Sequence, residues 1–118
     1  MKFLHGKGYL DQVTEIIESH QDLSAAVAFW GSGVELLFRK RKGKARTRLL
    51  CNLGSGCCNP TVIRELLSRP DFEVRQLTDL HAKVVLGDEN HIILGSANFS
   101  ANGLSLEGSE ATAWEEAG

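Results

Sequence analysis

The chain has 118 residues, of which 42% are apolar and 24% are charged, and its formal net charge is −2. These values are typical of one soluble globular domain, and the overall charge gives no sign of nucleic-acid binding. The longest apolar run, Ala25 to Trp30, is far too short to span a bilayer, and no apolar segment of a signal peptide follows the N-terminus. We therefore expect a single soluble domain over residues 1–118, located in the cytoplasm and without membrane contact.

The three cysteines, Cys51, Cys57 and Cys58, cannot all pair with one another. Their spacing resembles neither a disulfide framework nor a zinc site, which favours a reducing compartment. We expect them to be small buried residues or a loop pair.

The first half of the chain predicts alternating helices and strands. Val13, Ile16 and Ile17 recur at helical spacing, and Asp11 can cap that segment, so a helix is expected over residues 11–20. The next elements are a buried strand, a short helix, a second strand and a glycine-containing loop, expected over residues 23–30, 34–39, 46–53 and 52–59.

In the second half, strands cluster. Asn59 followed by Pro60 is a favoured helix start, because Asn caps the first turn and Pro suits the first helical position. The apolar face of this helix would be Val62, Ile63, Leu66 and Leu67, and Pro70 ends it. Strands are expected over residues 72–77, 81–86, 91–94 and 109–114, with a hairpin turn over 87–90. Together the elements predict an α/β fold, a mixed β-sheet with helices packed on its faces.

One hairpin gathers the residues with chemical potential. His81 and Lys83 lie two apart on a predicted strand, so their side chains leave the same face, opposite Val84 and Leu86. We expect these two apolar side chains to pack inward. The returning strand would bring Ser96 and Asn98 beside His81 and Lys83. An imidazole, an ammonium, a hydroxyl and a carboxamide would then converge, a set that suits a phosphoryl group.

The same hairpin shows no set of metal ligands. The sequence has no cluster of carboxylates for Mg²⁺ and no His/Cys set for Zn²⁺, so we expect chemistry without a metal or another cofactor. His91 is interpreted as a strand-end residue rather than a ligand, and His5 and His20 are expected to be exposed. Trp30 and Trp114 are expected in the core or at its rim.

From His81 onward the sequence reads HxK, four residues, Asp88, six residues and then GSxN, ending at Asn98. This pattern resembles the signature of the phospholipase D superfamily at every fixed position, and its long fixed gaps make the match specific. The resemblance is detailed over residues 81–110. It implies a phospholipase D-like fold.

The resemblance also implies a mechanism. His81 would attack phosphorus and form a phosphohistidine intermediate, which water later releases. Lys83 and Asn98 would hold the non-bridging oxygens, and Ser96 would donate a further hydrogen bond. A second histidine, from a second copy of the motif, would protonate the leaving oxygen.

Two acidic residues have expected roles beside this set. Glu110, with Glu107 as the competing assignment, would hold the His81 imidazole in the correct tautomer, as a carboxylate does for other catalytic histidines. Asp88 falls in the predicted turn and is expected to be a structural residue of the motif.

The sequence contains one motif copy, whereas the reaction of the family needs two. We therefore expect a homodimer whose two-fold axis passes near the active site. Small single-motif members of the family resemble this arrangement, and many of them are nucleases. Family domains continue past the last strand, whereas this sequence stops at Gly118, so it is expected to be a piece of a longer protein with a further domain.

Seven of the 13 Lys and Arg residues lie between Arg39 and Arg48. This run is either a solvated loop or a track for a phosphate backbone beside the active site, and we favour the second, with Lys40, Lys42, Lys44 and Arg46 as substrate-binding residues. The favoured function is a metal-independent phosphodiesterase acting on DNA or RNA. The alternatives are a lipid or small-molecule phosphodiesterase, which the lack of a membrane-binding segment disfavours, and a non-catalytic nucleic-acid-binding module.

Overall fold

The protein is described here by a computed structural model, which covers residues 2–4, 6–54, 56–96, 98, 99 and 104. These residues form two α-helices, one 3₁₀-helix and five strands. In chain order these are α1 (Gly6–Ser19), β1 (Asp22–Val27), η1 (Val34–Phe38), β2 (Arg46–Cys51), α2 (Pro60–Leu67), β3 (Phe72–Gln76), β4 (Lys83–Gly87) and β5 (His91–Leu94).

The five strands form one mixed sheet in the order β3-β2-β1-β4-β5. Strands β1, β2 and β3 run parallel, while β4 is antiparallel to β1 and β5 is antiparallel to β4. The predicted α/β fold with a mixed sheet is therefore confirmed. Because β4 is antiparallel to its neighbour β1, the first residue of β4 lies at the same end of the sheet as the last residue of β1.

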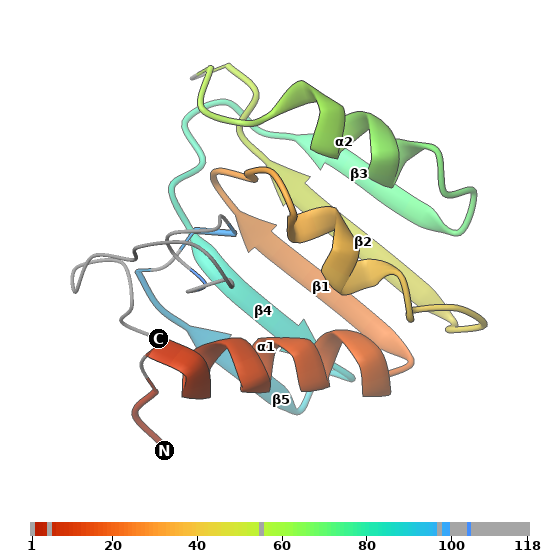
Figure 1. Cartoon of the computed structure of the whole chain (residues 1–118), viewed down its shortest axis with the longest axis vertical. Coiled ribbons are helices and arrows are strands. Elements are labelled where there is room, and N and C mark those ends of the chain that lie inside the picture. Colours follow the sequence, from red (N-terminus) through yellow and green to blue (C-terminus); the bar gives the residue numbers. More distant parts are fainter. Residues whose placement is uncertain (1, 5, 55, 97, 100–103, 105–118) are drawn as a thin grey trace.

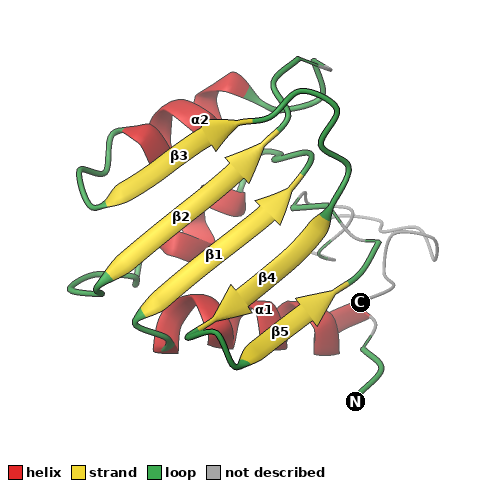
Figure 2. Cartoon of the chain, turned by 180° about the vertical axis from the view of Figure 1, so that it is seen from behind, coloured by secondary structure: helices red, strands yellow, loops and turns green. Residues whose placement is uncertain are grey.

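All the described helices cover one face of the sheet, as Figure 1 shows. Seen from behind, the strands lie in front of the helices, and no described helix covers them (Figure 2). This arrangement follows from the strand patterns, since alternate residues of β1 are buried on the helix side while the intervening ones remain half-exposed. The sequence analysis expected helices on the faces of the sheet, whereas the described helices cover only one face.

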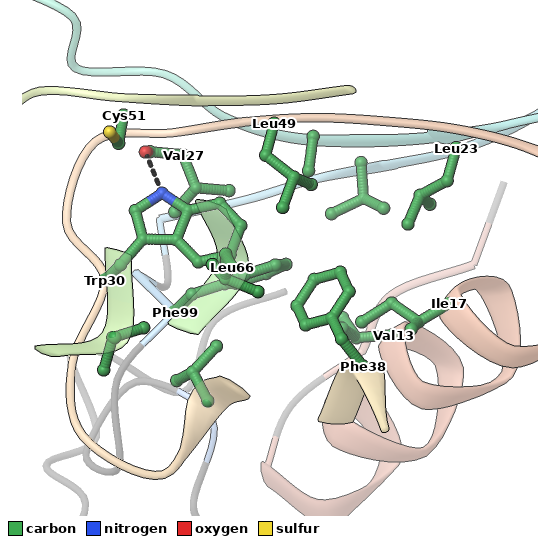
Figure 3. Close-up of a cluster of buried hydrophobic side chains, with 14 of the residues drawn as sticks. Val13, Ile17, Leu23, Val27, Trp30, Phe38, Leu49, Cys51, Leu66 and Phe99 are labelled. Atoms are coloured by element: carbon green, nitrogen blue, oxygen red, sulfur yellow. Dashed lines mark hydrogen bonds between the residues drawn. The ribbon is translucent and has the colours of Figure 1, made fainter. Parts of the chain in front are cut away.

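The core lies between the sheet and these helices. Trp30, Phe38 and Phe99 are almost fully buried and pack against the strands (Figure 3), and the indole nitrogen of Trp30 donates to the carbonyl of Val27 at 2.7 Å. Burial of one large apolar side chain stabilises a fold by about 1.5–3 kcal/mol. Trp30 is thus a core residue, as expected, and the loop after β1 is held firmly to the residues that follow β5.

Helix α1 starts earlier than predicted. Asp11 lies inside the helix, so its expected role as a cap is wrong. The reason is Tyr9, which is buried and extends the apolar face of Val13, Ile16 and Ile17 by one turn towards the N-terminus.

Helix α2 begins as predicted. The side chain of Asn59 accepts a hydrogen bond from the backbone N–H of Thr61 at 2.9 Å, and Pro60 is the first helical residue. Val62, Ile63 and Leu66 are buried, but Leu67 is 55% exposed and does not belong to the packed face. The strand expected over 23–30 also ends sooner, at Val27, because the chain turns there towards Trp30.

Two predictions about cysteine and the C-terminal region have different outcomes. Cys51 and Cys58 are buried free thiols, whereas Cys57 is exposed. The strand expected over residues 109–114 and the side chain of Trp114 lie outside the described residues. Within the described part of the chain, no helix combines the length and the apolar character needed to cross a bilayer.

Candidate active site

The candidate site lies where β1 ends and β4 begins. Val27 is paired with Lys83, and the next backbone N–H, of Ala28, donates to the carbonyl of Ala82 at 3.0 Å. His81 therefore lies just before the first residue of β4, beyond the end of the strands, although the sequence predicted it to lie within that strand. Ligand sites in open α/β sheets commonly lie beyond the carboxyl ends of the parallel strands. We call this end of the strands the His81 end of the sheet.

His81 and Lys83 are in contact. The ammonium of Lys83 donates to the carbonyl of His81 at 2.8 Å and lies 3.3 Å from each ring nitrogen of the same residue. An ammonium can only donate, so it interacts favourably with whichever ring nitrogen carries the lone pair. Lys83 is only 9% exposed, and its burial lowers the pKa of the ammonium. The imidazole of His81 is exposed to solvent.

The strand faces are the reverse of our expectation. Lys83 and Val85 point to the side covered by helices, whereas Val84 and Leu86 point to the side that no described helix covers. Strand alternation correctly separated the two sets. It did not show which set faces the core. Lys83 occupies a core-side position at the first residue of β4, where its ammonium reaches the carbonyl of His81.

Two residues that the sequence did not single out position His81. The side-chain amide of Asn52 donates to the carbonyl of Leu80 at 3.2 Å, which ties the segment before His81 to the end of β2. The Phe29 ring meets the His81 imidazole edge to face, with centroids 6.4 Å apart. A polar residue where the predicted strand 46–53 and the predicted loop 52–59 overlap could have suggested Asn52. Phe29 gave no signal, because it lies within an apolar run.

The hairpin brings the GSxN segment back to this end. Leu94 pairs with Val84, and the backbone N–H of Gly95 donates to the carbonyl of Lys83 at 3.1 Å. Four residues later, Phe99 forms a bridge to Trp30 in the loop after β1. Ser96 and Asn98 therefore lie on the stretch of chain that passes from Lys83 to Trp30.

Asn98 contributes an unusual polar atom. Its side-chain oxygen is buried and has no hydrogen-bond partner. A buried amide oxygen without a partner is costly and is rare in folded proteins. Ser96 is exposed. Glu107 and Glu110, the two candidate acidic partners of His81, lie outside the described residues.

The predicted basic track lies elsewhere. Arg46 begins β2 and pairs with Asp22 at the start of β1, so Lys40, Lys42, Lys44 and Arg46 lie towards the opposite end of the sheet from His81. The expectation that they flank the active site is therefore wrong. Because β1 and β2 are parallel, the loop that enters β2 must lie at the end where β1 starts.

Arg41, in the middle of the basic run, is fully buried. Its guanidinium donates to the hydroxyl of Thr47 and to four backbone carbonyls, those of Ile17, His20, Gln21 and Arg46. Its contacts join the end of α1 to the starts of β1 and β2. Arg41 is thus a structural residue rather than a surface cation.

Asp88 lies at this opposite end, in the turn between β4 and β5. One carboxylate oxygen accepts from the backbone N–H of Asp22 at 2.8 Å, and the other lies 2.7 Å from Nδ1 of His20. The backbone hydrogen bond from Asp22 and the contact with His20 lower the pKa of Asp88. Asp88 and Glu89 both have positive φ, and Asn90 donates back to Gly87, which is the pattern of a type I′ hairpin turn. We call this the Asp88 end of the sheet.

Of the remaining histidines, His5 lies outside the described residues and His20 differs from expectation. His20 was expected to be exposed, but its side chain is only 19% exposed because it contacts Asp88 and His91. His91 begins β5, the position expected of a strand-end residue. In the part of the chain that the structure covers, no three His, Cys, Asp or Glu side chains are grouped so that they could hold a metal ion.

Comparison with known proteins supports the fold. No family model matches the sequence, and no match is found among curated proteins. Among solved structures, NucT from Helicobacter pylori is similar with a TM-score of 0.68 and 21% sequence identity over 80% of this chain and 69% of that chain. The archaeal chromatin protein TrmBL2, whose structure shows a novel mode of DNA binding, is similar with a TM-score of 0.56 and 16% identity, over 80% of this chain and 38% of its own. The mixed sheet with its helices is therefore the fold of NucT.

Proposed function

We propose that this protein is a metal-independent phosphodiesterase that cleaves nucleic acid through a covalent intermediate on His81. The observation that supports this most directly is the contact between the exposed His81 imidazole and the buried Lys83 ammonium at the carboxyl end of β1. A nucleophile beside a preorganised cation is what attack on a phosphodiester anion requires. The match to the phospholipase D signature assigns the same two residues.

In the first step, a ring nitrogen of His81 attacks phosphorus and a P–N bond forms. The P–O bond to the leaving group breaks, and a second imidazole donates its proton to that oxygen. In the second step, water attacks phosphorus, the P–N bond breaks and the same second imidazole takes the proton from water. Lys83 and Asn98 would hold the non-bridging oxygens throughout, and Ser96 would add one hydrogen bond.

The second imidazole would come from a second copy of the chain. Each copy supplies one HxK segment at an exposed sheet edge, so a two-fold axis near His81 would bring two imidazoles to one phosphate. Glu110, or Glu107 in its place, would orient each imidazole. Monomeric protein at working concentration in sedimentation equilibrium, combined with full activity, would contradict this part of the proposal.

Nucleic acid is the proposed substrate class because the basic segment lies at a distance from His81 that suits a long polyanion. From Asp22 to Val27 the strand spans about 17 Å, which corresponds to about five phosphates along one strand of a duplex. Lys40, Lys42, Lys44 and Arg46 would then contact phosphates remote from the one that is cleaved. The similarity in fold to TrmBL2, a protein whose structure shows DNA binding, is consistent with this class.

The test is cleavage of single- and double-stranded DNA and RNA in buffer containing EDTA. Wild-type protein should cleave at least one of these substrates, His81→Ala should not, and His91→Gln should behave as wild type. His91→Gln is the matched control because it also removes an imidazole, but at the opposite end of the sheet. Cleavage that requires a divalent ion, or that persists in His81→Ala, would contradict the proposal. Turnover of phosphatidylcholine without cleavage of nucleic acid would replace the proposed substrate class by a lipid.

A further inference from the structure

Three polar side chains lie in a row at the Asp88 end of the sheet. The carboxylate of Asp88 is 2.7 Å from Nδ1 of His20, and Nε2 of His20 is 3.2 Å from Nδ1 of His91. They come from the turn after β4, the residue after α1 and the start of β5. None of the three has a role in the proposed phosphodiester chemistry, which takes place at the other end of the sheet.

The row determines the tautomer of His20. An ionised carboxylate can only accept, so Nδ1 of His20 carries the proton that it donates to Asp88. In the neutral ring, Nε2 then presents its lone pair towards His91. A carboxylate that orients an imidazole in this way is the usual outer partner of a metal-bound histidine, where it also raises the basicity of the ligand.

The two facing nitrogens are also spaced like two ligands of one ion. Bonds of about 2.0–2.1 Å in a tetrahedral arrangement place two imidazole nitrogens about 3.3 Å apart. The nitrogens of His20 and His91 are 3.2 Å apart, and their rings meet at 72° rather than stacking. A small displacement of the rings would open room for an ion between the two lone pairs.

We propose that His20 and His91 form a binding site for a divalent transition-metal ion of the class that prefers imidazole, such as Zn²⁺, Ni²⁺ or Cu²⁺. On binding, the proton of His91 moves through solvent from Nδ1 to Nε2, and both facing nitrogens donate lone pairs to the ion. Two waters leave the ion, and its other positions keep water. Hard ions such as Mg²⁺ and Ca²⁺ prefer oxygen ligands and are excluded from this class.

The surroundings hold the site in place. A Cβ on Gly87 would come within 2.6 Å of the His20 ring, so this ring lies directly against the backbone of β4. Asp88 is fixed by the N–H of Asp22 and in return donates its own N–H to the carbonyl of Asp22 at 2.9 Å. The His20 and Asp88 side chains are still 19% and 38% exposed, which leaves access for an ion and its waters.

The site would link two parts of the fold that are far apart in the sequence. His20 leads into β1, and His91 begins the edge strand β5. An ion that binds the folded state but not the separated histidines stabilises that state by mass action. The consequence is a metal-dependent increase in thermal stability that leaves the His81 end unchanged.

The experiment is calorimetric titration of Ni²⁺ and, separately, Zn²⁺ into the full chain without an affinity tag at pH 7.5, together with thermal unfolding at each metal concentration. Wild-type protein should bind one equivalent per chain and unfold at a higher temperature with metal. His91→Gln should weaken binding by at least about tenfold, and Asp88→Asn by about tenfold through its effect on His20. His81→Gln is the matched control and should bind as wild type.

Because the His20 ring packs against the backbone of Gly87, His91 is the primary variant, and far-ultraviolet circular dichroism tests whether it is folded. Three results would overturn the proposal: no saturable binding up to about 1 mM metal, unaltered affinity in His91→Gln, or loss of binding in His81→Gln alone. Equal binding of Mg²⁺ would overturn the assigned metal class. All of these readouts are independent of phosphodiesterase activity.

Discussion

The polar groups at the two ends of the same sheet differ in how completely they are hydrogen-bonded. At the Asp88 end, Arg41 donates to five oxygens and the Asp88 carboxylate is held by Asp22 and His20. At the His81 end, the imidazole is exposed and the side-chain oxygen of Asn98 is buried without a partner. Polar groups that satisfy one another stabilise a fold, whereas groups with unused hydrogen-bonding capacity can receive a ligand. The comparison therefore separates the hydrogen-bonded Asp88 end from the His81 end, where a buried amide oxygen has no partner among the described contacts.

The largest expected effect is a loss of stability at the Asp88 end of the sheet. Replacement of Arg41 by Met leaves four carbonyls and one hydroxyl without their donor in a buried setting, which should cost about 3–5 kcal/mol of unfolding free energy. Urea unfolding monitored by circular dichroism measures this loss. The exposed Arg48→Met is the control and should change stability by less than about 0.5 kcal/mol. Equal effects of the two variants would remove the distinction between the two ends.

Lys83 should show the reverse behaviour. Lys83→Met removes the cation that would stabilise the charged transition state, so the rate of phosphodiester cleavage should fall by about 10²–10³-fold. Stability should be unchanged or higher, because a desolvated ammonium is replaced by an apolar side chain of similar length. Burial lowers the pKa of Lys83, so the ammonium loses its proton at a lower pH than an ordinary lysine does. The wild-type cleavage rate should therefore begin to fall, as the pH rises, before the pH reaches the ordinary lysine pKa. A stability loss with normal cleavage would assign Lys83 to the fold instead.

A smaller effect is expected from the basic loop. The triple variant Lys40→Gln, Lys42→Gln, Lys44→Gln should weaken binding of a 20-base-pair duplex by about tenfold at low salt and reduce the salt dependence of binding. Cleavage of a dinucleotide should be unaffected, because these residues lie at the far end of the sheet from His81. An equal loss for the two substrates would place the loop at the reacting phosphate.

The smallest effect concerns acid stability. The pKa of Asp88 is lowered in the folded state, so its contribution to stability is complete above the ordinary carboxyl pKa of about 3.9 and is lost as the pH falls through the lower folded value. Asp88→Asn should therefore be less stable than wild type at pH 7, and the difference should shrink below about pH 4. Thermal unfolding between pH 3 and pH 7 measures this. A difference that grows on acidification would contradict the assigned direction.

How far the sequence predicted this fold depends on how local each signal was. The start of α2 was predicted to the residue because Asn59 and Pro60 act within one turn. The turn and the second strand of the β4–β5 hairpin were also predicted, since turn residues and alternation are local, but β4 begins at Lys83 rather than at His81. The start of α1 was not, because the burial of Tyr9 depends on packing with distant parts of the chain.

The same distinction applies to the candidate site. The spacing of His81, Lys83 and Asn98 is a local pattern and could be read from the sequence. The positions of Phe29 and Asn52 beside the HxK segment depend on which strands are neighbours, and so does the separation of the basic loop from His81. The burial of Arg41 within a run of surface cations has no signature in composition or spacing.

The central claim is that cleavage proceeds through a covalent bond between phosphorus and His81, and the stereochemical course at phosphorus tests it most directly. A phosphodiester made chiral with sulfur would be hydrolysed by the wild-type protein in ¹⁸O-labelled water, in the presence of EDTA. Each in-line displacement inverts the configuration, so two successive displacements predict overall retention. Inversion would show a single direct attack by water and would contradict the role assigned to His81.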